Sequence, residues 1–138
     1  MAVALILSAG MCVAQNQTAP LSTKDFFGKW IVTDVVGYTN ISAGIPEARR
    51  ILGKVLTITP NWMEFDKSRC TPNGGYTISE VDSATKLREF FDLSLLDAGL
   101  PPRTTLLETN NCYAAFSVDP YRVLFSWNGV IVRAYRQK

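Results

Sequence analysis

Alternating apolar and polar positions recur along most of this chain and predict a mainly β protein. Residues 29–37 are rich in β-branched side chains and stop at a glycine, which is typical of a strand. The clearest turn signal is Asn128-Gly129, which lies between two apolar runs and suits a type I′ hairpin. The remaining predicted strands are residues 55–59, 62–66, 76–81, 103–109, 112–118, 122–127 and 130–135.

The hydrophobic pattern changes to a helical period in two places. Pro46 and Glu47 suit the first turn of a helix and Gly53 suits its end, so a helix of about two turns is expected between them. Residues 83–99 carry apolar side chains at helical spacing before a Pro-Pro pair, which predicts one or two short helices. We therefore expect about seven or eight strands with two short helical insertions.

An antiparallel sheet of this extent in so short a chain tends to curl, because closure removes its exposed edges. The predicted architecture is a single domain over residues 25–138, an antiparallel closed or nearly closed barrel. A barrel of about eight strands either fills with side chains or holds one small ligand. Another small β-structure is the alternative.

The first residues predict export rather than fold. Residues 1–14 form an apolar run of the length of a signal-peptide core, with small residues before a cleavage site after Ala14. No Lys or Arg precedes this run, which is atypical of a signal peptide. Residues 15–24 are polar and are expected to form a flexible leader. The mature protein is therefore expected to be secreted or periplasmic.

The cysteines agree with export. Cleavage would remove Cys12 and leave Cys70 and Cys112 as the one possible pair. In an oxidising compartment this pair predicts a disulfide, whereas two free buried thiols would require a reducing one.

Composition excludes several functions. The net charge is +2 without a concentrated basic face, which argues against nucleic-acid binding. The chain has no histidine and no nucleophile motif, so we expect neither an enzyme nor a metal or cofactor site. The carboxylate pairs Glu64/Asp66 and Glu80/Asp82 are interpreted as solvated charge. The apolar run in residues 1–14 is too short to span a membrane, and we expect a monomer.

Gly28-x-Trp30, in "FFGKW" at the start of the first predicted strand, resembles the signature of the lipocalins and related calycin barrels. The resemblance implies that Trp30 closes the base of a barrel and that an arginine from the last strand, here Arg133, packs across its indole. Such a cation–π contact is worth up to about 2 kcal/mol when desolvated. Members of this family are usually longer and carry a helix after the last strand.

Two functions remain open from the sequence. The first is a binding protein that holds a small apolar ligand against Trp30, Val32, Phe65 and Phe125, with the helix near Pro46 closing one end. The second is a protein-interaction module, for example an inhibitor or immunity-type protein, with a filled barrel. Its binding surface would lie on residues 38–50 or 94–103, because loops on a rigid scaffold commonly carry such contacts. The family resemblance favours the first function slightly.

Overall fold

The computed structural model describes Gly10 and residues 21–138. The predicted signal peptide, residues 1–14, and residues 15–20 of the predicted leader lie outside the described residues, apart from Gly10. Thr23 and Lys24, at the end of that leader, already belong to a 3-10 turn, η1 (Thr23–Phe26). Among the described helices, none combines the length and the apolar character needed to cross a bilayer.

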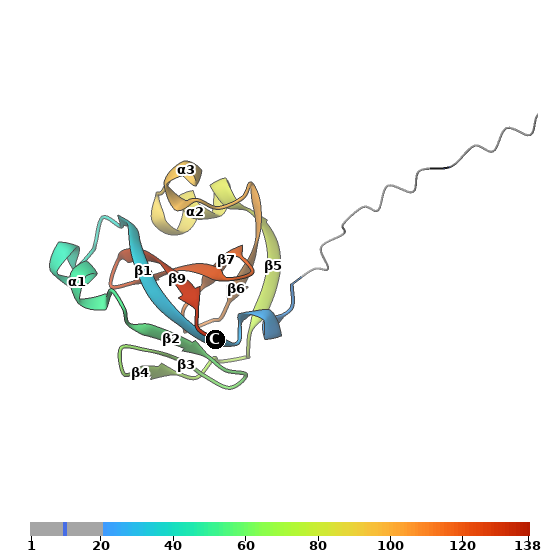
Figure 1. Ribbon diagram of the computed structural model, residues 1–138, viewed down its shortest axis with the longest axis horizontal. Helices are drawn as coiled ribbons and strands as arrows, with labels where there is room; N and C mark the ends of the chain where they lie inside the picture. The colour runs from blue at the N-terminus through green and yellow to red at the C-terminus, as the bar shows by residue number, and fades with distance from the viewer. Residues whose placement is uncertain (1–9, 11–20) are drawn as a thin grey trace, which may run out of the picture.

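The protein is mainly β, and its strands form a single antiparallel sheet of nine strands in the order β4-β3-β2-β1-β9-β8-β7-β6-β5 (Figure 1). The prediction of seven or eight strands was too low, because it missed the short strand at residues 68–70. The strands are β1 (Gly28–Tyr38), β2 (Val55–Ile58), β3 (Met63–Phe65), β4 (Ser68–Cys70), β5 (Thr77–Asp82), β6 (Arg103–Glu108), β7 (Ala115–Asp119), β8 (Arg122–Trp127) and β9 (Val130–Arg136).

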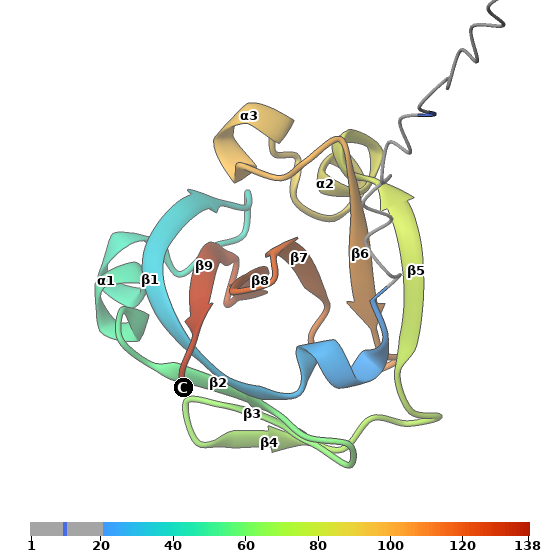
Figure 2. The same ribbon diagram turned by 45° about the vertical axis from the view of Figure 1, so that its right-hand side comes forward.

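The sheet curls into an open half-barrel and not into the predicted closed or nearly closed barrel (Figure 2). Strands that follow one another in the chain are paired, and β9 returns to pair with β1. The exception is β4 and β5, which are consecutive but unpaired and form the two edges. Between them Gly74 and Gly75 both take φ of +80°, a left-handed conformation that turns the chain away from a hairpin. We call this interruption between β4 and β5 the seam.

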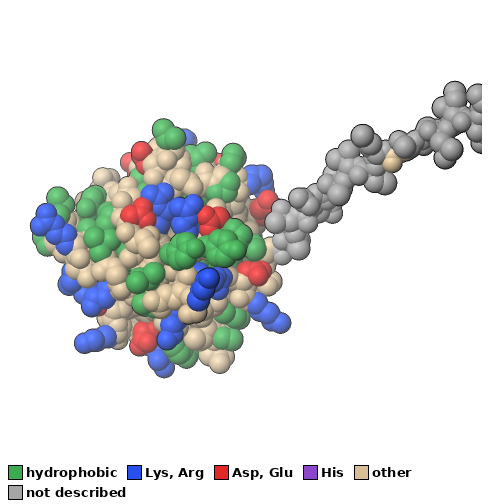
Figure 3. Space-filling model, viewed as in Figure 1, with side chains coloured by type: hydrophobic (Ala, Val, Ile, Leu, Met, Phe, Trp, Pro, Cys, Tyr) green, Lys and Arg blue, Asp and Glu red, His purple; other side chains and the backbone are tan. Residues whose placement is uncertain are grey.

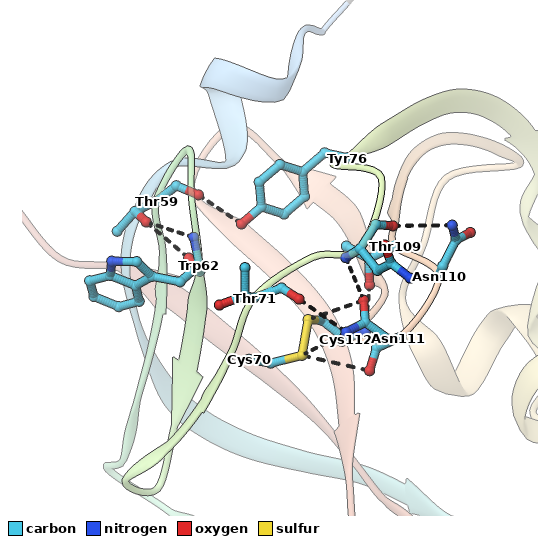
Figure 4. Close-up of a disulfide and its surroundings, with 10 residues drawn as sticks. Thr59, Trp62, Cys70, Thr71, Tyr76, Thr109, Asn110, Asn111 and Cys112 are labelled. Carbon is cyan, nitrogen blue, oxygen red and sulfur yellow. Dashed lines mark hydrogen bonds between the residues drawn. A yellow bond between two sulfur atoms is a disulfide. The ribbon is translucent and has the colours of Figure 1, made fainter.

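The predicted disulfide between Cys70 and Cys112 is confirmed, and it lies across the seam (Figure 4). Cys70 is the last residue of β4, whereas Cys112 follows β6, the partner of β5. Side-chain amides join the same two segments: Asn111 accepts from the amide N of Asn73 at 2.8 Å and donates to the carbonyl of Thr71 at 3.0 Å. Covalent and hydrogen bonds thus replace the ladder that a closed barrel would have here.

The two predicted helical insertions contain three α-helices: α1 (Gly44–Ile51), α2 (Ser83–Phe91) and α3 (Leu95–Ala98). The side chain of Asp82 caps α2 by accepting from the amide N of Thr85, and Ser94 caps α3 in the same way. The left-handed residues Asp92 and Gly99 end these two helices. The second insertion is therefore a pair of short helices.

The curled sheet buries a different apolar cluster on each face. The inner cluster fills the half-barrel and includes Ala48 and Ile51 of α1, which covers one end. The outer cluster lies between the sheet and α2 with α3, which pack across its upper part in Figure 1. The helices therefore complete the fold on both faces of the sheet.

Irregular pairing with β9 changes which side chains of β1 face the inner and the outer cluster. Its register with β9 shifts between Val32 and Asp34 and again between Val35 and Gly37. A shift of one residue exchanges the two faces of a strand. Val35 accordingly packs against the inner cluster and Val36 against the outer one, the reverse of strict alternation from Trp30.

Candidate functional site

The four residues predicted to line a ligand come together, but they form the core of the half-barrel. Trp30, Val32, Phe65 and Phe125 are each at most 2% exposed and belong to the inner cluster. The rings of Phe65 and Phe125 meet edge to face at 5.2 Å between centroids. These side chains therefore contact one another and leave no visible binding site between them.

A small cavity remains at the base of the half-barrel. It has a volume of about 80 Å³ and is lined by residues of η1, by the end of β7 and the turn that follows it, and by Trp30, Val123 and Arg136. Sites for organic ligands usually measure about 300–1,000 Å³. This cavity is therefore too small for a ligand of that class in the described conformation.

The arginine that packs over Trp30 is Arg136, so the expectation of Arg133 was wrong. The guanidinium carbon of Arg136 lies 4.1 Å from the ring centroid of Trp30. Arg136 also donates to the carbonyls of Phe27, at 2.8 Å, and Asp25. Gly28 has φ of +137° and sits so close to Arg136 that an added Cβ would lie 3.1 Å from its Nη1. The backbone conformation therefore favours glycine at this position, and a Cβ would in addition require Arg136 to shift slightly.

Arg133 faces the opposite side of β9. Side chains alternate along a strand, so residues three apart point to opposite faces. Arg133 pairs with Asp34 of β1 and donates to the carbonyl of Ala98, the last residue of α3, at 3.5 Å. Burial raises the pKa of Asp34, but hydrogen bonds from Arg133 and Thr33 outweigh it and hold that pKa below its ordinary value. Arg133 therefore attaches the outer helices to the sheet.

A carboxylate holds α1 against the end of the half-barrel. Glu47 accepts hydrogen bonds from Arg50, from Nε1 of Trp127 at 3.1 Å and from Nδ2 of Asn128 at 3.3 Å. Arg50 also lies 2.6 Å from a carboxylate oxygen of Asp66, in the β3–β4 turn. The hydrogen bonds from Arg50 hold the pKa of Glu47, and likewise the pKa of Asp66, below their usual values. This network fixes the orientation of α1, and its charged groups are paired with one another.

The other carboxylates considered from the sequence also have basic partners. Glu64 lies 3.6 Å from Arg69, and Glu80 lies 3.6 Å from Arg103. Within the part of the chain that is described, no group of three or more Cys, Asp or Glu side chains is placed to hold a metal ion. These acids therefore form isolated ion pairs.

Exposed apolar side chains occur in small groups, separated by charged residues on the face seen in Figure 3. One group is the stacked pair Tyr121 and Tyr135, whose ring centroids lie 6.3 Å apart. Beside it, Arg122 forms an ion pair with Asp119. The remaining exposed large apolar side chains of the described residues are Tyr38, Ile41, Ile45, Leu52, Phe90 and Leu96.

Two of these side chains line a common groove, which we call the Ile41–Phe90 groove. It has a volume of about 350 Å³ and lies between residues 39–41, after β1, and residues 88–92, at the end of α2. Ile41 is 92% exposed and Phe90 is 39% exposed. An aliphatic side chain held in water beside a half-exposed aromatic ring suits an apolar contact with another molecule.

The loop that carries Ile41 is held firmly to the β8–β9 turn. The amide N of Thr39 donates to the carbonyl of Gly129 at 2.8 Å, and that of Ala43 donates to the carbonyl of Asn128 at 3.0 Å. Gly129 has φ of +76°, and an added Cβ would clash with the backbone of Ile41. This close approach fixes the loop, so Ile41 needs little ordering before it makes a contact.

The sequence predicted a binding loop at one of the two segments that line this groove. Residues 38–50 and 94–103 were both proposed as binding loops, and they carry Ile41 and Leu96, the two most exposed large apolar side chains described. Phe90 lies in the predicted helical segment, residues 83–99, and was not expected to form part of a binding surface. Both Phe90 and Phe91 approach Phe116, each with 6.0 Å between ring centroids, so their adjacent positions on the helix do not reveal that Phe90 stays 39% exposed.

The chain was compared with protein-family models, with curated proteins and with solved structures, and none of the three comparisons found a match.

Proposed function

We propose that this protein is a non-enzymatic, exported protein-interaction module that binds a partner protein at the Ile41–Phe90 groove. The observation that carries the proposal is the 92% exposure of Ile41 on a loop fixed to the β8–β9 turn. The packed interior supports it, because the residues that would line a ligand site contact one another instead. The disulfide is consistent with an oxidising compartment.

The resemblance to the lipocalins and calycins remains part of this proposal. Gly28, Trp30 and Arg136 support it, since an arginine of the last described strand packs over the tryptophan. The open seam between β4 and β5 departs from a closed barrel. If the protein is related to that family, its proposed binding surface is the external Ile41–Phe90 groove and not the interior of the barrel.

The experiment compares two matched variants, Ile41→Asp and Leu96→Asp. Both side chains are more than 90% exposed, but Leu96 lies on α3 and does not line the groove. Each tagged protein is expressed in the native host, purified, and examined by native mass spectrometry and crosslinking. We expect a partner protein that binds wild type and Leu96→Asp but binds Ile41→Asp about tenfold or more weakly, since a buried isoleucine contributes about 1.5–3 kcal/mol.

Two outcomes contradict the proposal. One is a partner that binds all three proteins equally, which would place its contact elsewhere. The other is a retained small-molecule adduct without any protein partner, which would favour the apolar-ligand function. Thermal unfolding of both variants serves as the control for folding. Neither substitution is expected to change the free energy of unfolding by more than about 0.5 kcal/mol, because both positions are exposed.

A further inference from the structure

The strand β5 ends the sheet on one side and leaves one of its edges open. It pairs with β6 along its whole length, from Thr77 opposite Glu108 to Asp82 opposite Arg103. Its chain neighbour β4 belongs to the other end of the sheet and does not pair with it. In Figure 2 β5 stands at the margin of the curled sheet with β6 on one side.

The register identifies the backbone groups that point away from the sheet. The amide N of Ser83 donates to the carbonyl of Pro102 at 2.9 Å, which continues the β5–β6 pairing by one residue. Hydrogen-bonded positions alternate in an antiparallel pair. Ser79 and Val81 therefore bond to β6, whereas the N–H and C=O groups of Ile78 and Glu80 point outward. Within the described residues, no hydrogen bond reaches these outward groups.

Open edges in natural sheets are commonly protected by charged side chains, especially Lys, by Pro, by a bulge or by a very short strand. The other edge, β4, has three residues and is crosslinked through Cys70. The six residues of β5, "TISEVD", include neither Lys nor Pro, their pairing with β6 is regular, and their charged residues are the acids Glu80 and Asp82. Such an edge can accept an added strand of the opposite charge, because main-chain hydrogen bonds supply the affinity.

Charge selects the kind of strand that fits. The β5–β6 pair carries three carboxylates, Glu80, Asp82 and Glu108, and one guanidinium, Arg103, in a protein whose net charge is +2. The side chain of Glu80 is 68% exposed, and its ion pair with the exposed Arg103 at 3.6 Å is weak. A basic residue opposite Glu80 would therefore be favoured.

The same charges disfavour a second copy of the chain. Antiparallel pairing of two β5 edges centred on Glu80 would place Glu80 directly opposite Glu80. Like charges in that position destabilise a strand pair. Self-pairing centred on Ser79 would instead place Glu80 opposite Ile78 and would form no charge pair. A basic strand from a different polypeptide does form one, so it fits the edge better.

We propose that the outer edge of β5 accepts an extended, basic segment of another polypeptide as a tenth, antiparallel strand. The segment would receive hydrogen bonds from the amide groups of Ile78 and Glu80 and donate to their carbonyls. This inference does not depend on the Ile41–Phe90 groove, since none of the groove residues belongs to β5.

The test uses a blocked peptide of alternating Lys with Thr or Val as the probe, and isotope-labelled protein observed by amide hydrogen exchange. In the free protein, the amides of Ile78 and Glu80 should exchange faster than those of Ser79 and Val81. Saturating basic peptide should slow exchange at Ile78 and Glu80 by about tenfold or more. A peptide with Glu in place of each Lys, and a basic peptide N-methylated at alternate residues, should both fail.

Two protein variants assign the site. Glu80→Lys should reverse the preference, so that the acidic peptide protects the edge and the basic one does not. Glu89, on α2, is an acid whose side chain is 59% exposed and lines the Ile41–Phe90 groove; Glu89→Lys should leave protection unchanged, as should Ile41→Asp. If Glu80→Lys does not fold, the comparison of basic and acidic peptides on the wild-type protein still tests the proposal.

Three results would overturn the proposal. The first is unchanged exchange at Ile78 and Glu80 with the basic peptide at millimolar concentration. The second is protection that appears only at other residues. The third is protection without peptide that rises with protein concentration, which would show that the edge pairs with its own copy.

Discussion

Arg133 and Arg136, both on β9, have different roles, which their positions along the strand explain. Arg136 covers Trp30 and binds the carbonyls of η1 and the residue after it, whereas Arg133 points outward to Asp34 and α3. Both arginines belong to β9. Val130, Val132 and Ala134 of this strand lie in the inner cluster, and Arg136 is the arginine an even number of residues away from them, so it faces the same side. The arginine over the tryptophan could therefore have been identified by its position in the alternation.

Replacing Arg136 by alanine should destabilise the protein by about 2–3 kcal/mol, because the indole loses its cation–π contact and two carbonyls lose a charged donor. Urea unfolding, followed by tryptophan fluorescence, measures this. The matched control is Arg122→Ala, which removes an exposed ion pair with Asp119 and should cost less than about 1 kcal/mol. Equal losses in the two variants would contradict the role assigned to Arg136.

At the scale of elements, α1 is attached mainly by polar contacts at its exposed side and by two small apolar contacts beneath it. Ala48 and Ile51 reach the inner cluster, and Glu47 with Arg50 connects the helix to the β8–β9 and β3–β4 turns. A helix of eight residues is marginal alone, so these contacts determine whether it stays folded. The helix is therefore expected to respond to acid before the sheet does.

Because the folded pKa values of Glu47 and Asp66 lie below their ordinary values of 4.5 and 3.8, the ionised network stabilises α1 fully above those values. This stabilisation is lost as pH falls through the folded pKa values. Amide protection factors across residues 44–51 should therefore stay constant down to about pH 4.5 and decrease below it, ahead of those in β9.

Glu47→Gln is the matched variant for this prediction. It should already lower the protection of α1 at neutral pH and should reduce the further loss in acid. Glu89→Gln, on α2, should leave α1 unchanged. Protection of α1 that followed β9 throughout the titration would show that the network does not attach the helix independently.

Local signals in the sequence predicted elements well where one residue type dictates a conformation. Asn128 and Gly129 both take positive φ in the predicted turn, and the Cys70–Cys112 pair formed as expected. The strand at residues 68–70 is too short to show a period, and the shifts in β1 come from pairing with β9 across about a hundred residues. The Ile41–Phe90 groove likewise depends on how two distant segments meet, so only its loop was foreseen.

At the scale of the whole molecule, the seam is where the sheet lacks a ladder and the disulfide takes its place. The crosslink spans 42 residues and joins β4 to the loop after β6. A further contact joins the residue before β5 to the β2–β3 turn, because the hydroxyl of Tyr76 donates to the carbonyl of Thr59 at 2.7 Å (Figure 4). Global stability should therefore depend strongly on one covalent bond.

The double variant Cys70→Ser/Cys112→Ser should lose about 4 kcal/mol of unfolding free energy, the chain-entropy value for a loop of this length. Urea unfolding measures the loss, with wild type kept reduced by a dithiol as the matched control. The two should agree within about 0.5 kcal/mol. A loss below about 1 kcal/mol would mean that the amide contacts around Asn111 hold the seam without the crosslink.

The pairing of the first strand with the last has a consequence for synthesis. A chain that emerges amino-terminal end first can fold β1 against β2, but the other edge of β1 has no partner until residues 130–136 have appeared. During that interval Trp30 and its neighbours would face solvent, which exposes a nascent chain to aggregation. Completion of the sheet therefore has to wait until residues 130–136 have been released, and chaperones that bind unfolded chains would meet the protein during that interval.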